Sequence, residues 1–165
     1  MTSLSYKVKK AGWYTITNTA YRYYPGITFP AGMLSTKSAV SYRFHTKPKS
    51  NALAQVFSVT MVPIGLDRWN KAEGGSTTNV ALQLNRYAQN PDAKRGKNPK
   101  LKSLTVKMSP DGGRTWRTIG VRKINGSWTA IVPNPAAGAV TLRARATYTS
   151  GGYTDVTIYR AYGIA

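Results

Sequence analysis

The chain has 165 residues, enough for one ordinary domain or two small ones, and 24 Lys and Arg face five Asp and Glu, a net charge of +19. It has no cysteine, which excludes disulfides, thiolate nucleophiles and cysteine-bound metals. Hydrophobic residues make up 41% of the chain. They suffice for a core but form no run of about 18, so we predict no membrane insertion.

Four segments of the first half have strand patterns and are separated by turn residues. The second segment alternates, with Val40, Tyr42 and Phe44 on one face. The third is a nearly continuous apolar run, which predicts a central strand. The four segments are 13–24, 37–45, 52–63 and 78–88.

A basic, turn-rich stretch follows at 89–102, with two Asn-Pro steps. Its composition predicts a long exposed loop or a linker, and its charge makes it a candidate contact for a chain polyanion. The candidate residues are Lys94, Arg95, Lys97, Lys100 and Lys102.

The second half predicts a succession of hairpins. Asn125-Gly126 is a strong two-residue turn signal. The segment 139–149 alternates cleanly, with apolar residues on one side and Arg143 and Arg145 on the other. Alternate strand residues lie about 7 Å apart, which is close to the separation of successive phosphates along a single strand. These two arginines are therefore also candidates for polyanion binding. Gly151-Gly152 then leads into a last strand at 153–163.

Short strands with dense turn signals and no helical period predict an all-β fold. About six strands from residue 78 onward favour an immunoglobulin-like or fibronectin-like β-sandwich at 78–165. Residues 1–77 would form a further β-rich unit, packed on the sandwich or extending it.

Catalytic chemistry has little support in the residues. His45 is the only histidine and lies mid-strand near Arg43 and Lys47, which does not suit a carboxylate-supported base. One histidine and five scattered acids do not easily supply the ligands of a metal site. Asp67 and Glu73 lie in one loop, and we predict that both are solvated surface residues. We therefore expect no enzyme activity, no metal and no cofactor.

The sequence SPDGGRTW joins two strand-like runs, 101–108 and 115–121. Pro, Asp and Gly here specify a hairpin turn. It fits the pattern Ser-x-Asp-x-Gly-x-Thr-Trp and so resembles the Asp-box, a hairpin of sialidase propellers and other secreted β folds. The resemblance implies a structural role, in which the Asp holds the loop amides and the Trp packs beneath the turn. The matching residues are Ser109, Asp111, Gly113, Thr115 and Trp116.

A wider stretch, about 101–164, resembles the β-rich C-terminal region of large secreted subtilisin-like serine peptidases of actinobacteria. The matching motifs are the hairpin at Val106–Trp116, the WTA strand at Trp128–Ala130, VTLRARA at Val140–Ala146 and IYRAY at Ile158–Tyr162. The protease signatures themselves are absent from the chain. The resemblance implies a noncatalytic C-terminal accessory domain, linked covalently to an upstream peptidase and secreted to the cell exterior.

The net charge of +19 supports a second hypothesis about the function, and the residues do not decide between the two. Such a surface attracts polyanions, although high charge also keeps a secreted domain soluble. The alternative function is a freestanding extracellular module that binds polyanions, glycans or a cell-wall polymer.

Overall fold

The computed structural model describes residues 6–48, 54–86 and 98–165, and every regular element in them is a β-strand. The all-β prediction is therefore confirmed. In chain order the strands are β1 (Gly12–Tyr21), β2 (Lys37–Thr46), β3 (Phe57–Pro63), β4 (Lys71–Ala72), β5 (Thr77–Arg86), β6 (Leu101–Ser109), β7 (Arg117–Ile124), β8 (Ser127–Pro133), β9 (Ala139–Tyr148) and β10 (Tyr153–Ile164).

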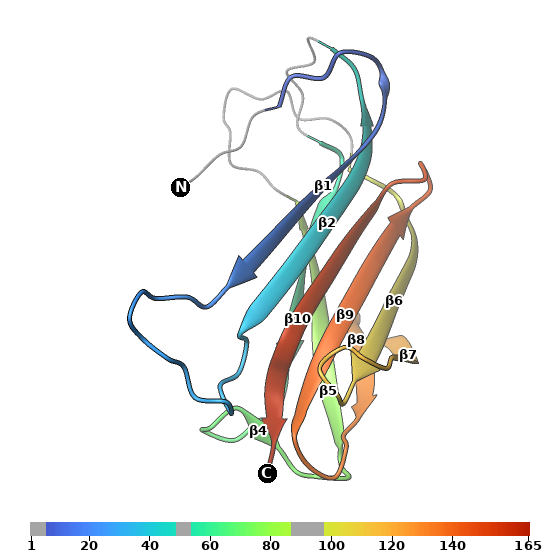
Figure 1. The fold of residues 1–165 in the computed structure, drawn as a ribbon. Helices are drawn as coiled ribbons and strands as arrows, with labels where there is room; N and C mark the ends of the chain where they lie inside the picture. Colours follow the sequence, from blue (N-terminus) through green and yellow to red (C-terminus); the bar gives the residue numbers. More distant parts are fainter. Residues whose placement is uncertain (1–5, 49–53, 87–97) are drawn as a thin grey trace.

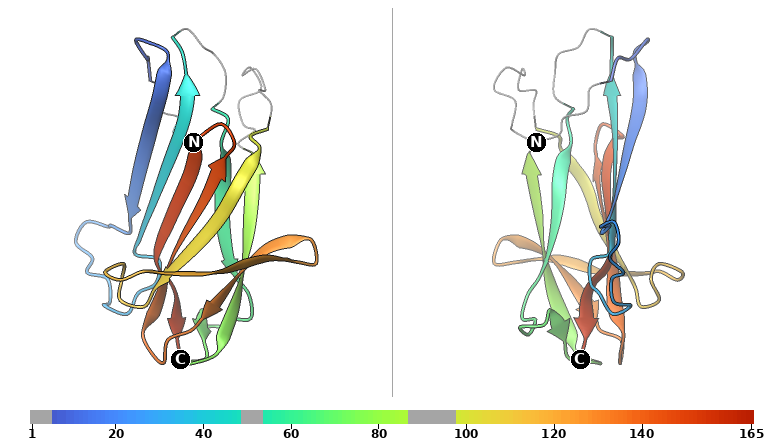
Figure 2. Two further views of the ribbon diagram at one scale, coloured as in Figure 1. Left: turned by 90° about the vertical axis from the view of Figure 1, so that its right-hand side faces the viewer. Right: turned by 60° about the vertical axis from the view of Figure 1, so that its left-hand side comes forward.

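All ten strands belong to one sheet with the order β1-β2-β10-β9-β6-β7-β8-β5-β3, and β4 pairs in parallel with β10 beside this path (Figure 1). The sheet folds over at β7, because residues 117–119 pair with β6 and residues 120–124 pair with β8. Two layers consequently face each other (Figure 2). The larger holds β1, β2, β10, β9 and β6, and the smaller holds β8, β5 and β3.

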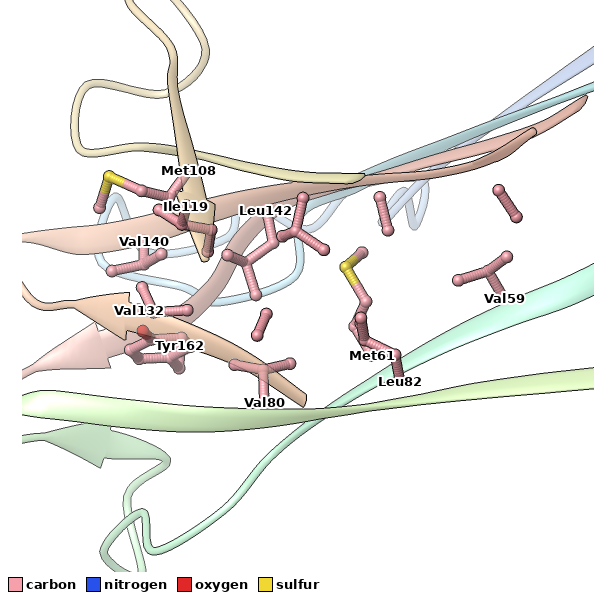
Figure 3. Close-up of a cluster of buried hydrophobic side chains, with 14 of the residues drawn as sticks. Val59, Met61, Val80, Leu82, Met108, Ile119, Val132, Val140, Leu142 and Tyr162 are labelled. Carbon is pink, nitrogen blue, oxygen red and sulfur yellow. The ribbon is translucent and has the colours of Figure 1, made fainter. Parts of the chain in front are cut away.

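The hydrophobic core lies between the two layers. From β9, Val140 and Leu142 are completely buried, and from the opposite layer Val80 and Val132 are too. Figure 3 shows these side chains converging between the strands. The period-two alternation predicted for β9 is therefore the pattern that fills this core.

Polar side chains also join the layers. The hydroxyl of Tyr148 accepts a hydrogen bond of 2.8 Å from the Phe57 backbone amide on β3, and Thr154 Oγ1 donates one of 2.8 Å to the Phe57 carbonyl. The two hydroxyls lie 2.7 Å apart. Since the Thr154 hydrogen is used on Phe57, the Tyr148 hydroxyl donates to Thr154. Burial raises the pKa of Tyr148 above its usual value.

A second buried network lies at the C-terminal end of β8. The side-chain amide of Asn134 donates to Thr78 Oγ1 at 2.8 Å and to Ser76 Oγ at 3.0 Å. Its oxygen accepts a 2.8 Å hydrogen bond from the hydroxyl of Tyr162. Burial raises the pKa of Tyr162 to about 12.

The first two strands extend the larger layer, since β2 pairs with β10 and β1 pairs residue by residue with β2. The predicted boundary between residues 77 and 78 falls within β5, and strands from both sides of it share one sheet. The prediction of a central strand at 52–63 is wrong. β3 ends the strand order, where Val59 and Met61 face the core while Val62 is 38% exposed.

Candidate functional site

The side of the larger layer that points away from the core carries a set of cations. Cross-strand register defines it: Arg43 lies opposite Tyr153, Arg145 opposite Asp155, and Lys107 opposite Arg143. Since directly opposed residues share a face, these side chains lie together. We call this surface the outer face, and its cations are Lys37, Arg43, Lys107, Arg143 and Arg145.

At its centre two arginines share one carboxylate. Arg143 Nε donates to Oδ1 of Asp155 at 2.9 Å, and its Nη2 donates to Oδ2 at 3.0 Å. Arg145 Nε donates to Oδ2 at 2.6 Å. The side chain of Asp155 is 9% exposed, whereas each arginine side chain is 41% exposed. Hydrogen bonding to Asp155 raises the pKa of Arg143 above its usual value.

Aromatic rings lie beside the cations on the same face. The guanidinium carbon of Arg145 is 4.3 Å from the ring centroid of Tyr153, and Lys37 Nζ is 4.9 Å from that of Tyr159. Near β1, the guanidinium of Arg43 lies 5.2 Å from the ring of Trp13. Such contacts hold long cationic side chains over the sheet.

The strands β6, β9 and β10 border an open hollow of about 360 Å³ on the outer face. Two of its lining residues, Thr105 and Lys107, are exposed. The full lining is Thr105, Lys107, Arg143, Arg145 and Asp155.

The hairpin turn between β6 and β7 is held by side chains. Asp111 Oδ1 accepts from the backbone amides of Arg114 at 3.0 Å and Thr115 at 2.9 Å, and from Ser109 Oγ at 2.7 Å. Asp111 Oδ2 accepts from the Thr115 hydroxyl at 2.6 Å. These hydrogen bonds, that to the Thr115 hydroxyl foremost, lower the pKa of Asp111 far below its usual value.

The same turn contains a tryptophan and a glycine in contact. The indole Nε1 of Trp116 donates a 2.9 Å hydrogen bond to the Gly113 carbonyl, and the Gly113 amide donates to the buried Ser109 Oγ at 2.8 Å. All five residues singled out in the motif are thus brought into one small unit.

The predicted loop candidates separate into two groups. Lys94, Arg95 and Lys97 lie outside the described residues. Lys100 and Lys102 are exposed at the start of β6. Arg143 and Arg145 lie on the outer face, as the alternation of β9 predicts.

The remaining candidates from the sequence lie away from this centre. His45 is exposed on β2, with its ring 5.6 Å from that of Trp13. Asp67 accepts hydrogen bonds from the backbone amides of Trp69 and Lys71 in its own loop. In the described parts of the chain, no three His, Cys, Asp or Glu side chains gather as metal ligands.

Sequence reasoning missed Asp155 and the participation of Lys37, Arg43 and Lys107. A signal for Asp155 was present: a hairpin turn at 150–152 places it opposite Arg145. The other three depend on the pairing of β2 with β10 and of β6 with β9, which joins segments distant in sequence.

Within the described ranges, no helix has the length and apolar character needed to cross a membrane. No protein-family model matches the chain, and no curated protein or solved structure matches it either.

Proposed function

We propose that the chain is a noncatalytic accessory domain that holds anionic polymers on the outer face. The observation that carries this proposal is the presence of five cations on one sheet face, where Asp155 pairs with two of them. That carboxylate, Asp155, is already shared by Arg143 and Arg145, so the face keeps a positive surplus. Polyanion binding to such a surface is driven by counterion release.

The geometry favours an extended polymer over a small isolated ligand. Cations occur on three of four adjacent strands, namely β2, β9 and β6 but not β10, and neighbouring strands are spaced about 4.8 Å apart in a sheet. They run from Arg43 and Lys37 on β2 to Lys107 on β6. A flexible chain of negative charges lying across the strands meets several cations in succession.

The parent protein is part of the proposal. The motif resemblance at 101–164 supports covalent linkage to an upstream secreted subtilisin-like peptidase, which the outer face would anchor to an extracellular or cell-wall polymer. The immunoglobulin-like or fibronectin-like sandwich is proposed with it, and the layer order β3-β5-β8 against β6-β9-β10 supports that assignment. The alternative is a freestanding module with the same face.

The binding proposal is tested by titrating the full chain with heparin, polyphosphate and single-stranded DNA at about 50 and 200 mM salt. We expect affinity to fall steeply with salt. Replacing Lys37, Arg43 or Lys107 by Gln should reduce the salt slope by about one contact each.

Lys123→Gln is the matched control, because Lys123 lies on β7 where that strand pairs with β8, outside the outer face. It removes the same charge and should leave the slope nearly unchanged. Equal effects of all four variants, or salt-insensitive binding, would contradict the proposal. Sequencing the native gene upstream of residue 1 tests the linkage: a peptidase-coding frame supports it, and an adjacent signal peptide supports the freestanding alternative.

A further inference from the structure

We infer that the hollow between β6, β9 and β10 is a defined site for one tetrahedral oxyanion, a phosphate or sulfate group carried by the polymer. The inference rests on the proposed function and gives the outer face a specific docking point. Its residues are Thr105, Lys107, Arg143, Arg145 and Asp155.

The hydrogen-bonding groups around the hollow are almost entirely donors. Lysine and arginine side chains have no acceptor atoms. The carboxylate of Asp155 is the strongest acceptor there, and both of its oxygens already accept hydrogen bonds from Arg143 or Arg145. A ligand that brings acceptor oxygens therefore fits, and one that brings mainly donors does not.

Asp155 also fixes the direction of the donors. Both arginines use Nε on the carboxylate, and the guanidinium carbon of Arg145 lies over the Tyr153 ring, 4.3 Å from its centroid. Among the described residues neither terminal nitrogen of Arg145 has a hydrogen-bond partner, and Arg143 Nη1 has none. A preorganised fork loses less conformational entropy when it binds an oxyanion than a free side chain does.

The charge and size of the hollow agree with this ligand. Lys107, Arg143 and Arg145 supply three positive charges and Asp155 one negative, so the lining keeps two positive charges in excess, which favours a phosphate or sulfate group whether that group carries one or two negative charges. The volume of about 360 Å³ exceeds what one oxyanion fills, and the hollow is open. The group can thus remain attached to a polymer that continues toward Arg43 or Lys37.

The test is a titration of the full chain with inorganic phosphate and inorganic sulfate at low salt, followed by amide chemical shifts. We expect saturable binding, with the largest shifts on β6, β9 and β10. Lys107→Gln should weaken binding about threefold to fivefold, the range of an exposed ion pair. Lys107 is exposed, so this variant is expected to keep the fold. Lys123→Gln should leave the affinity unchanged.

Asp155→Asn separates a built site from simple attraction. This variant raises the positive charge but releases the two arginines, so attraction by charge alone predicts tighter binding of phosphate. The built site predicts weaker binding. Thermal unfolding of Asp155→Asn checks that this variant is folded. If it is not, the comparison of the phosphate affinities of Lys107→Gln and Lys123→Gln tests the site instead.

Competition experiments with polymers distinguish whether the bound group is a phosphate or a sulfate. Polyphosphate and heparin should each compete with the inorganic ion for the hollow, and the tighter competitor identifies phosphate or sulfate as the preferred group. A polymer bearing only carboxylates should bind the face but compete poorly.

Absence of saturable ion binding in a chain that still binds heparin would overturn this inference and leave the proposed function standing. Saturable ion binding without any polymer binding would overturn the proposed function instead.

Discussion

Gly113, in the turn after β6, packs directly against Tyr159 of β10. A Cβ at this glycine would lie 3.2 Å from Tyr159 Cε1 and 3.3 Å from Trp116 Cζ2. The ammonium group of Lys37 lies over the ring of Tyr159. The hairpin motif therefore borders the outer face, and its turn helps to position one of the aromatic rings there.

Gly113→Ala should destabilise the protein more than Gly112→Ala. Both glycines have positive φ, +94° and +74°, so both variants carry backbone strain of about 1–3 kcal/mol. Only the Cβ at Gly113 meets neighbouring atoms. Urea unfolding measures both variants, and equal destabilisation would show that the contact with Tyr159 and Trp116 contributes nothing.

Asp111→Asn should make the stability of the protein less sensitive to acid. The folded pKa of Asp111 lies below its unfolded value of 3.8, so the folded state binds fewer protons than the unfolded state as the pH falls through this range. Stabilisation by the carboxylate is present above pH 3.8 and is lost as the pH falls toward the folded pKa.

Urea midpoints of wild type and Asp111→Asn between about pH 5 and pH 2 measure this dependence. The difference in urea midpoint between wild type and Asp111→Asn should become smaller as the pH falls. A constant gap would mean that the carboxylate is not the acceptor that holds the turn amides.

Tyr162 should titrate late in base. Its folded pKa of about 12 lies above the usual 10.0, so its contribution to stability is complete below pH 10 and is lost as the pH rises through 12. Tyrosinate absorbance should show this late step, and Tyr162→Phe should reduce its amplitude by one tyrosine, because the pKa of Tyr148 is also raised. Tyr23→Phe is the control, because Tyr23 is 79% exposed. Loss of the late step in the control alone would refute the assignment.

Tyr148 and Thr154 should act as a unit in joining the layers. Tyr148→Phe leaves the Phe57 amide without its partner, which costs about 1–3 kcal/mol. Thr154→Val removes the donor to the Phe57 carbonyl. In a double-mutant cycle the two losses should be non-additive by about 0.5 kcal/mol or more. Strict additivity would show that the two hydroxyls are independent despite their contact.

The sequence predicted features that depend on local pattern. The alternation of β9 identified the inward row through Tyr148 and the outward Arg143 and Arg145, because the period of two and the burial of one face reinforce each other. Turn chemistry likewise located the hairpin at Asn125-Gly126, where both residues have positive φ.

Features that depend on distant pairing escaped prediction. The apolar run of β3 indicated a central strand, but such a run does not reveal whether both edges of the strand are paired. A bulge in β10 gives Arg160 a φ of +53° and lets its Nε donate to the Met33 carbonyl, 127 residues away in sequence. No local signal marks that contact, because its partner lies in the loop between β1 and β2.

The β1–β2 hairpin widens the outer face without entering the fully buried core, since no residue of the described range 6–48 is buried. We therefore expect a gradient of local stability along the sheet, with the outer face reaching beyond the part of the fold that determines cooperative unfolding. Amide exchange should release β1 first and β9 last. Substitutions of the outward-facing side chains of this hairpin should thus change the outer face with little effect on global unfolding, whereas Tyr42 and Phe44 on its inward side pack against the core.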